Sequence, residues 1–402
     1  MYVHGIRRLF DFPGYVIARI TMSPDLVEVR LERDKRFRLP CPACGGSMAE
    51  NRPRYQTARD LPLGSAIQVL LVYQAIQGRC SHCGRIATIR PPGIHDHARA
   101  TDRLMRLLCR LARYLPLSHA GEVLGIDAAT AGRWDRIILQ AGLPPPKLDG
   151  LRILLIDEKA VRKRHGYVTL VMNGQTGELL YLAEGKKKES LKGFFDRLSK
   201  AQKASIEAVA MDRAGAYHQV VKDELPQAAV VFDKFHLIAN YNEVMDEVRR
   251  QEWHKASAKD KGIIKGQRFN LFRNPENRTA PQTRSLMNLL HINRNLAVAH
   301  ILRDALGQVW TYSFRTWAEK YLDKWVRWTF VSGIEALKKF GRSVLKAKEE
   351  ILNFCDHPIT LGPLESFNNT VSRIIHRACG VSDLDYLFLK LRQESLDFVP
   401  QK

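Results

Sequence analysis

Residues 151–184 read LRILLIDEKAVRKRHGYVTLVMNGQTGELLYLAE, and this stretch decides the fold class. It holds three apolar runs of strand length, and the GQTG tetrapeptide between the last two is typical of a hairpin turn. Beyond it, the hydrophobic pattern predicts an amphipathic helix at 190–202, a strand at 207–212, a helix at 215–225 and a fifth strand at 228–233. The sequence therefore predicts a mixed α/β domain.

The order of these elements narrows the prediction. Three antiparallel strands followed by alternating helices and strands is the order of an RNase H-like core. From about 237 to 355 the sequence is almost wholly helical, and residues 364–378, LESFNNTVSRIIHRA, predict one more helix. We therefore expect an RNase H-like core formed by 151–236 and 356–402, with an all-helical insertion at 237–355.

The N-terminal part of the chain has a different character. Residues 15–24 and 25–34 alternate between apolar and polar residues, as half-buried strands do, and helical periodicity follows after residue 100. The stretch GLPPPKLDG at 142–150 has three prolines and two glycines, so it cannot continue a helix and is expected to be a linker. We expect a β-rich domain at 1–97 and a small helical domain at 98–141.

The charge balance points to a class of partner. The chain carries 63 Lys and Arg residues against 42 Asp and Glu residues, a formal net charge of +21. The excess is spread over the chain and is not confined to a tail. A folded protein this basic usually meets a polyanion, with DNA or RNA the leading candidate, although a basic surface can also serve solubility alone. No run of about 18 apolar residues exists, so we expect no membrane span.

Two CxxC pairs lie in the β-rich domain, at Cys41 with Cys44 and at Cys80 with Cys83, with 35 residues between them. Each pair, followed by glycine, lets one tight turn aim two thiolates at one ion. Four thiolates satisfy tetrahedral Zn²⁺ without an open position, so we expect one structural zinc ion in a zinc ribbon. His82, inside the second pair, is the alternative fourth ligand, and the opposing interpretation is two unrelated turns with buried cysteines.

A helix-turn-helix is predicted at 118–139, SHAGEVLGIDAATAGRWDRIIL. Gly125 falls at the turn, and Asp127 can cap the second helix. The exposed face of that helix would offer Thr130 and Arg133 to DNA. Any short helical hairpin resembles this pattern, but the neighbouring cysteine pairs and the basic composition favour duplex DNA as the partner.

Three carboxylates are candidates for metal-dependent chemistry. Asp157 is predicted to end the first strand of the core and Asp212 the fourth, and these strands are neighbours in an RNase H-like sheet. Two facing carboxylates repel each other unless a cation separates them, and Mg²⁺ prefers oxygen ligands. Glu365, at the start of the last helix, would complete a site for two Mg²⁺ ions that promotes in-line phosphodiester transfer. Glu158 is a rival for the first position, but on a strand it points to the opposite face.

Other polar residues surround these three in the sequence. Asp233 ends the fifth strand and is the rival for the second position, although its spacing to His236 suggests local hydrogen bonding that supports the site. Asn368 and Asn369 lie one turn after the Glu365 position of the last helix. They could bind phosphate or brace a carboxylate, or they could simply cap or solvate the helix.

The chain resembles bacterial insertion-sequence transposases of the DDE type, in the ISL-three group. The resemblance is carried by IDEKAVRKRHGYVTLV, MDRAGAYHQVVKDELPQAAVVFDKFHL, RNLAVAHILRDAL and LESFNNTVSRIIHRACG. It implies that Asp157, Asp212 and Glu365 form the catalytic triad, with two Mg²⁺ ions that Mn²⁺ can replace. It also implies a zinc ribbon, a helix-turn-helix, an α-helical insertion, and binding to terminal inverted repeats as a homodimer or higher homo-oligomer. A cytoplasmic protein, associated with the nucleoid when bound to DNA, is expected.

One departure from the family pattern concerns the last helix. The family usually has a lysine seven residues after the glutamate, where this chain has Ser372, with Arg373 next to it. Arg373 is offset from that position by one residue step, about 100° around the helix. We expect Arg373 and Arg377 to contact DNA.

The sequence therefore predicts a DNA transposase that binds inverted repeats and catalyses strand cleavage and strand transfer. A catalytically inactive DNA-binding regulator built on the same scaffold is the alternative. An RNase H-like nuclease acting on RNA or on junctions is a third interpretation. The helix-turn-helix disfavours RNA, because the major groove of A-form RNA is too narrow for a helix.

Overall fold

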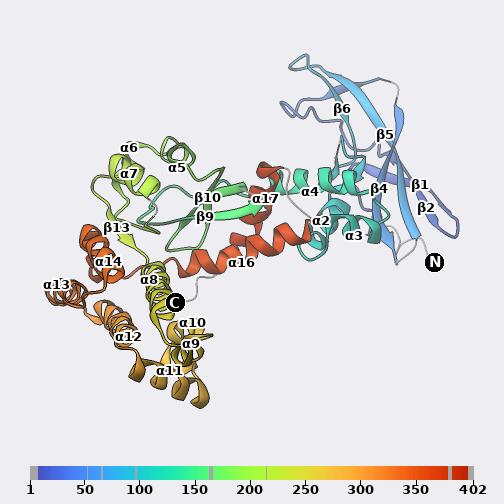
Figure 1. Ribbon diagram of the computed structural model, residues 1–402. Helices are drawn as coiled ribbons and strands as arrows, with labels where there is room; N and C mark the ends of the chain where they lie inside the picture. The colour runs from blue at the N-terminus through green and yellow to red at the C-terminus, as the bar shows by residue number, and fades with distance from the viewer. Residues whose placement is uncertain are drawn as a thin grey trace. The chain divides into compact units, whose positions relative to one another are not determined.

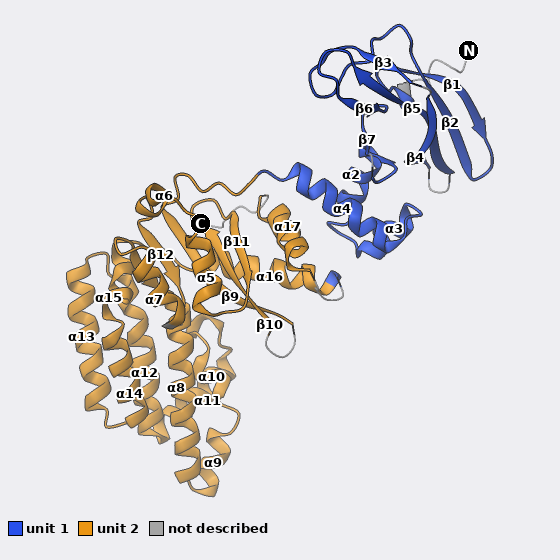
Figure 2. Ribbon diagram, turned by 90° about the horizontal axis from the view of Figure 1, so that it is seen from above, with its two compact units in different colours: residues 1–144, 377–379 blue, residues 145–376, 380–402 orange. Residues whose placement is uncertain are grey.

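The computed structural model shows a mixed α/β protein that divides into two compact units (Figure 2). The first unit comprises residues 1–144 with 377–379, and the second comprises 145–376 with 380–402. Figure 1 labels the helices and strands. The structure describes residues 8–51, 53–64, 67–95, 97–162, 166–213, 215–378 and 383–396.

The first unit is built on an antiparallel-rich sheet with the order β1-β2-β5-β4-β8-β7, and β3 and β6 pair with the far end of β5. Every second residue of β2 is buried, as in Val27, Val29 and Leu31, and the apolar side chains of β5 pack beside them. The predicted alternation is thus the reason that one face of this sheet forms a core. The strands are β1 (Tyr15–Met22), β2 (Leu26–Arg33), β3 (Met48–Glu50), β4 (Arg54–Leu63), β5 (Ile67–Cys80), β6 (Ile86–Ile89), β7 (Ile94–His95) and β8 (Ala100–Thr101), preceded by the short helix η1 (Arg8–Phe10).

Three helices complete the first unit: α2 (Asp102–Leu111), α3 (Leu117–Val123) and α4 (Ala128–Gly142). Gly125 adopts φ +62° in the turn between α3 and α4, a conformation that favours glycine. Asp127 caps α4 as predicted, because its carboxylate accepts a hydrogen bond from the backbone N–H of Thr130 at 2.9 Å. Trp134 of α4 is buried in the small core that the three helices share.

The second unit contains a five-stranded sheet with the order β11-β10-β9-β12-β13. The first three strands of this sheet, β9 to β11, pair in antiparallel fashion, whereas β12 runs parallel to both β9 and β13. The predicted adjacency of the first and fourth strands is therefore confirmed. The strands are β9 (Ile153–Arg162), β10 (Gly166–Asn173), β11 (Leu179–Glu184), β12 (Ala208–Met211) and β13 (Ala229–Phe232).

Both faces of this sheet are covered, which explains why its strands read as continuous apolar runs. Leu154 and Ile156 of β9 join one core with α5 (Lys188–Phe195) and α7 (Gly215–Glu224). Leu155 points the other way, into a second core with α16 (Gly362–Arg377) and α17 (Leu384–Ser395). Helices α16 and α17 therefore share a core with the central strand β9.

Two predictions about this unit are wrong in detail. The helix expected at 190–202 is two helices, α5 and α6 (Lys200–Ala204), because Ser199 and Gln202 form a capping box that starts a new helix. Asp157 does not end its strand, since β9 continues to Arg162 by pairing with β10 alone. The parallel pairing of β9 with β12, however, stops at Ile156, one residue before Asp157.

The segment between β13 and α16 is helical, as predicted. Its core gathers Tyr241, Trp325 and Phe340 edge to face. Trp325 is buried, whereas Trp317 and Trp328 on the same helix are 60% and 37% exposed. The helices are α8 (Lys234–Lys255), α9 (Ala258–Ile264), α10 (Arg268–Phe272), η2 (Pro275–Asn277), α11 (Ala280–Ile292), α12 (Arg294–Gly307), η3 (Gln308–Thr311), α13 (Arg315–Val331), α14 (Glu335–Lys346), α15 (Lys348–Leu352) and η4 (Asn353–Cys355).

Among the described residues, no helix combines the length and the apolar character needed to cross a membrane.

Candidate active site and metal-binding clusters

The sheet of the second unit brings Asp157 and Asp212 to neighbouring positions. Ile156 of β9 is paired with Met211 of β12, and each aspartate is the next residue along its strand direction. Parallel strands place corresponding residues at the same edge of a sheet, so both carboxylates leave the sheet at the same place. The sequence predicted this arrangement from the order of the strands, because the first and fourth strands are neighbours in an RNase H-like sheet.

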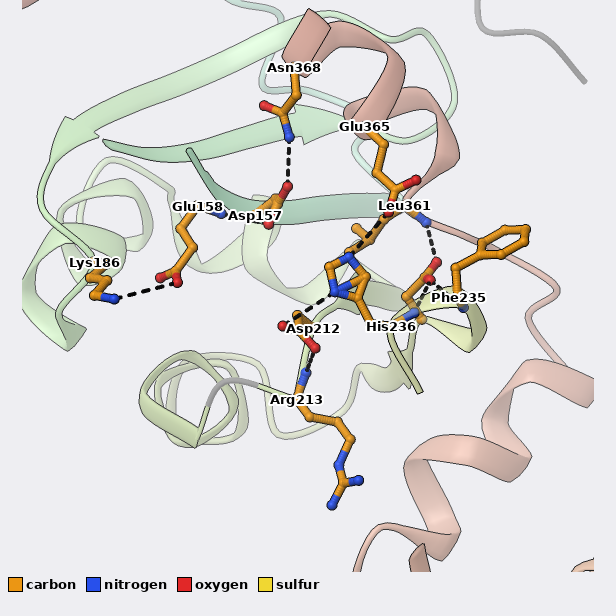
Figure 3. Close-up of polar contacts among 11 residues, drawn as sticks. Asp157, Glu158, Lys186, Asp212, Arg213, Phe235, His236, Leu361, Glu365 and Asn368 are labelled. Carbon is orange, nitrogen blue, oxygen red and sulfur yellow. Dashed lines mark hydrogen bonds and ion pairs between the residues drawn. The ribbon is translucent and has the colours of Figure 1, made fainter. Parts of the chain in front are cut away.

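Asp157 is held by two hydrogen bonds. Its Oδ1 accepts from the backbone N–H of Glu158 at 2.8 Å, and its Oδ2 accepts from the side-chain amide of Asn368 at 2.8 Å (Figure 3). Burial raises the pKa of Asp157, although both hydrogen bonds oppose that rise. The carboxylate is therefore fixed in orientation but disfavoured as an isolated anion.

His236 lies between Asp212 and Glu365 (Figure 3). Its Nδ1 is 3.4 Å from Oδ2 of Asp212, and its Nε2 is 3.2 Å from Oε1 of Glu365. A neutral imidazole has one N–H and can donate to only one of these oxygens, whereas the protonated ring can donate to both. His236 thus links the end of β12 to the first turn of α16.

Glu365 stands in the first turn of α16, the helix predicted to carry it. Burial raises its pKa, and the nearby charge of Asp233 raises it further, while His236 acts in the opposite direction. Two of the three predicted catalytic carboxylates, Asp157 and Glu365, therefore sit where a negative charge is unfavourable without a cation.

Asp233 is an almost fully buried carboxylate, 1% exposed, with both oxygens engaged. Its Oδ1 caps α8 by accepting from the backbone N–H groups of Phe235 and His236 at 2.7 and 3.2 Å. Its Oδ2 accepts from the backbone N–H of Leu361 at 2.8 Å. Asp233, His236 and Glu365 offer atoms within 4.8 Å of one another and could hold a metal ion. The hydrogen bonds favour the predicted supporting role over the role of a primary ligand.

Glu158 diverges from Asp157, as expected for consecutive residues of a strand. Its carboxylate lies 3.9 Å from the ammonium group of Lys186, and Figure 3 shows it turned toward that lysine. Burial raises the pKa of Glu158, and the charge of Lys186 lowers it. Lys186, the first of three consecutive lysines, thus has an acidic partner on β9.

The two asparagines of α16 have different environments. Asn368 is buried and donates to Asp157, while Asn369 is exposed. Ser372, at the family's usual lysine position, donates its hydroxyl to the carbonyl of Asn368 at 3.0 Å. Arg373 is exposed and donates to Thr370 at 2.9 Å.

Sequence patterns missed the backbone contact of Leu361 with Asp233. The two residues are 128 positions apart, and a backbone N–H group carries no signal in a sequence.

Of the predicted DNA-contacting residues, Arg133 is exposed on α4 and its guanidinium lies 3.4 Å from Thr130 Oγ1. Arg377 is the last residue of α16.

The four paired cysteines form one cluster in the first unit. Their sulfur atoms all lie within 4.8 Å of one another, with Cys41 3.7 Å from Cys83 and Cys44 3.6 Å from Cys80. The cluster could hold one metal ion, and His82 is not among its members. Gly45 and Gly84 both adopt φ +71° just after a CxxC pair, which is the turn that the sequence predicted.

The thiols of this cluster have divergent acidities. The backbone N–H of Cys83, 3.5 Å from the Cys80 sulfur, lowers the pKa of Cys80 to about 6. The backbone N–H of Gly46 acts in the same sense on Cys44, but the sulfurs of Cys83 and Cys80 outweigh it and raise the pKa of Cys44 to about 12. Crowded sulfurs cannot all ionise without a cation among them, so the chemistry of the cluster fits a thiolate-binding metal.

Comparison with known proteins identifies the family of this chain. Residues 154–391, which include all three carboxylates, match a family described as "Transposase", of the DDE type found in ISL3 elements. The chain is 30% identical over 391 residues to the transposase for insertion sequence element IS1001 of Bordetella parapertussis, covering 96% of each chain. It is 27% identical over 376 residues to the transposase for insertion sequence element IS1557 of Mycobacterium tuberculosis, covering 85% of this chain and 82% of that one. The chain therefore belongs to the ISL3 group of DDE-type insertion-sequence transposases.

Proposed function

We propose that this transposase cleaves DNA at the ends of its element and joins them to target DNA at a site formed by Asp157, Asp212 and Glu365. The observation that carries the proposal is the position of His236. One of its ring nitrogens lies 3.4 Å from a carboxylate oxygen of Asp212, and the other lies 3.2 Å from a carboxylate oxygen of Glu365. Asp157 leaves the sheet beside Asp212 because β9 and β12 are paired up to the preceding residues. Three carboxylates from distant parts of the chain thus surround one edge of what we propose is an RNase H-like sheet.

The donor set fits divalent cations. Carboxylate oxygens are the ligands that Mg²⁺ and Mn²⁺ prefer. Burial raises the pKa of Asp157 and of Glu365, so a cation would relieve an unfavourable accumulation of charge. When bound, two Mg²⁺ ions about 3.5–4 Å apart would supply the charge stabilisation that in-line phosphodiester transfer requires at the attacking and leaving oxygens.

The surrounding residues of the chain would keep the carboxylates in place. Asn368 holds one oxygen of Asp157 at 2.8 Å, and the backbone N–H of Arg213 holds Oδ1 of Asp212 at 2.5 Å. Asp233 fixes the start of α8, from which His236 projects. Such outer contacts orient the ligands before substrate arrives.

Recognition of the element ends is assigned to the first unit in this proposal. The zinc ribbon would occupy 1–97 and the helix-turn-helix 98–141, with Thr130 and Arg133 on the exposed side of α4. Tetrahedral zinc with Zn–S bonds of about 2.3 Å holds its sulfurs roughly 3.8 Å apart. The observed 3.6 and 3.7 Å separations within the cysteine cluster support one structural zinc ion.

DNA is the proposed partner, in two forms, and the chain would act as a homodimer or higher oligomer on it. The terminal inverted repeats of the element would be bound first, and target DNA would follow for strand transfer. Arg373 and Arg377 on α16 are proposed to contact DNA phosphates. The excess of basic residues, 63 against 42 acidic, supports a polyanionic partner.

The test uses labelled duplex carrying the element's own ends, incubated with the full-length protein and Mg²⁺. We expect strand cleavage by the wild type and loss of cleavage in Asp212→Asn, which keeps the size of the side chain. Asp223→Asn is the matched control, because Asp223 is an exposed residue of α7. Tight binding of the ends without cleavage under Mg²⁺ or Mn²⁺ would overturn the proposal and favour a DNA-binding regulator.

A further inference from the structure

The first unit contains a pocket of about 310 Å³ between its sheet and the N-terminal end of α4. This volume is at the lower end of the range, about 300–1,000 Å³, that small-molecule sites occupy. Arg59 of β4, Arg99 beside β8, and Thr130, Arg133 and Trp134 of α4 are among its lining residues. The pocket therefore joins the β-rich part of the unit to the predicted DNA-reading helix.

The pocket is positively charged. Arg59 is half-buried, and its guanidinium donates to the carbonyl oxygens of Gly125 at 2.8 Å and Leu124 at 3.0 Å, which are neutral acceptors. Burial lowers the pKa of Arg59, as expected for a desolvated cation. Within the part of the chain that the structure describes, no ion pair involves Arg59, Arg99 or Arg133.

Arg59 and Arg99 are held side by side by the backbone. The N–H of Arg59 donates to the carbonyl of Arg99 at 2.9 Å, and β4 pairs with β8 at this point. The two arginines therefore enter the wall of the pocket from neighbouring backbone positions, and an anion bound in the pocket would be attracted by both positive charges.

A further donor lines the pocket without a partner. Trp134 is 2% exposed, and its indole N–H makes no hydrogen bond within the described structure. A buried donor left unpaired costs roughly 1–3 kcal/mol, so such groups usually serve a ligand or an ordered water. The N-terminal end of α4 adds the positive end of a helix dipole. Asp127 is the acidic residue of the lining, and its carboxylate is engaged with the backbone N–H of Thr130.

We infer that this pocket binds a backbone phosphate of duplex DNA, and that Arg59, Arg99 and Arg133 clamp it while α4 enters the adjacent groove. The inference rests on the proposed binding of DNA by this unit. Phosphate is favoured because arginines present forked donors that match its oxygens, and a phosphodiester carries one negative charge with several acceptors. A contact of this kind fixes the register of the recognition helix and carries no sequence information itself.

The site places β4 and the segment before β8 in the DNA interface. The helix-turn-helix pattern identified Thr130 and Arg133 alone. Arg59 contributes twice, because the same guanidinium braces the Leu124–Gly125 turn between α3 and α4. Arg99 and Arg133 are the better residues to substitute, since both are exposed and neither has a carbonyl partner of this kind.

The experiment measures binding of fluorescent duplex to the full-length protein as a function of salt. Arg99→Asn suits the φ of +50° at that position, and Arg133→Gln keeps a polar side chain on the exposed face of α4. Each lost phosphate contact should reduce the slope of log K against log salt by about 0.9. When salt is raised from roughly 50 to 200 mM, the wild type loses affinity for DNA, and a variant that lacks one phosphate contact should lose about threefold less. The difference should be the same for inverted-repeat and unrelated duplex. Arg106→Gln, an exposed arginine of α2 outside the pocket, is the matched control.

Unchanged slopes in both pocket variants, with wild-type unfolding temperatures, would overturn the inference. Inorganic phosphate that raises the unfolding temperature through this pocket, with no change in DNA slope on substitution, would identify a free-anion site and would also overturn it. Strand cleavage is measured in parallel. If the wild type cleaves DNA but the pocket variants have unchanged slopes, the phosphate-binding inference is wrong and the proposed catalysis stands. If the slopes of the pocket variants change but the wild type does not cleave DNA, the proposed catalysis is wrong and the phosphate-binding inference stands.

Discussion

The side-chain amide of Asn368 donates to Oδ2 of Asp157 at 2.8 Å and joins two residues that are 211 positions apart. This contact ties α16 to β9 at one of the three proposed catalytic carboxylates. Its amide oxygen has no hydrogen-bond partner in the described structure, so the group is placed by the Asp157 contact.

Substitution of Asn368 should reduce cleavage while leaving DNA binding intact. Asn368→Ala removes the donor that orients Asp157, and loss of such an outer contact typically costs about 10–100-fold in activity or metal affinity. Cleavage rates at saturating DNA, measured as a function of Mg²⁺, give both quantities. Asn369→Ala is the matched control, because Asn369 is exposed on the same helix. Equal rates for the two variants would show that Asp157 does not depend on Asn368.

His236→Ala should raise the Mg²⁺ concentration needed for half-maximal cleavage and lower the maximal rate. The ring separates Asp212 from Glu365, and its removal would let two carboxylates shift. We expect an effect of about 10–100-fold, as for other residues that position metal ligands. His236→Asn, which retains one donor, should recover part of the activity, and Phe235→Ala, an exposed neighbour, should retain all of it. A Mg²⁺ titration unchanged from wild type in His236→Ala would contradict the role.

Asp233→Ala should destabilise the protein. Loss of the cap costs about 0.5–2 kcal/mol, and leaving the Leu361 N–H unpaired costs about 1–3 kcal/mol. Asp233→Asn should cost less, because asparagine is also a good cap. Urea unfolding followed by tryptophan fluorescence measures the difference. If Asp233→Asn were as stable as wild type but failed to cleave DNA, Asp233 would be a primary metal ligand and the structural role would be wrong.

Purified protein should contain one zinc ion per chain, and Cys80→Ser should lose it. The four sulfurs lie within 4.8 Å of one another and could hold one metal ion. Elemental analysis of the metal content checks this, together with the temperature at which the first unit unfolds. Cys355→Ala, a half-buried thiol in the helical insertion, should keep the metal. Full metal content in Cys80→Ser would contradict the zinc ribbon.

The stability of the magnesium-free protein should depend on pH through Asp157. Its pKa is raised in the folded state by burial, so the folded protein binds this proton more tightly than the unfolded chain does. The free energy of unfolding therefore falls as pH rises from the ordinary aspartate range through the raised pKa, and it is regained as pH falls. Asp157→Asn should be more stable than wild type above that window and should show a flatter pH dependence. Urea unfolding at several pH values, without chelators that would strip the zinc, measures both.

The same substitution separates stability from activity. Asp157→Asn should lower the cleavage rate by roughly 10³-fold or more, since a metal site supplies several kcal/mol of transition-state stabilisation. Asp223→Asn should change neither the pH dependence nor cleavage. A parallel fall of stability and activity in Asp157→Asn would indicate misfolding and contradict the proposed burial of an unfavourable charge.

The sequence by itself determined the order of the strands in the second unit, the position of Asp212 directly after its strand, and the two cysteine pairs. These features are local, because an apolar run, a residue at its end or a CxxC turn is specified by neighbours in the chain. The cap of α4 by Asp127 belongs to the same class. The break between α5 and α6 also has a local signal, the Ser199–Gln202 capping box, which the longer helical periodicity obscured.

Only the tertiary structure decided the contacts between distant segments. The approach of His236 to Glu365 spans 129 residues, and that of Asp233 to Leu361 spans 128. Both depend on how the helical insertion returns the chain to the sheet, and no periodicity encodes that path. The continuation of β9 beyond Asp157 was likewise a matter of pairing with β10, which extends a strand wherever a partner offers hydrogen bonds. The pocket between Arg59 and α4 has the same origin, since residues from a strand and a helix become neighbours only after folding.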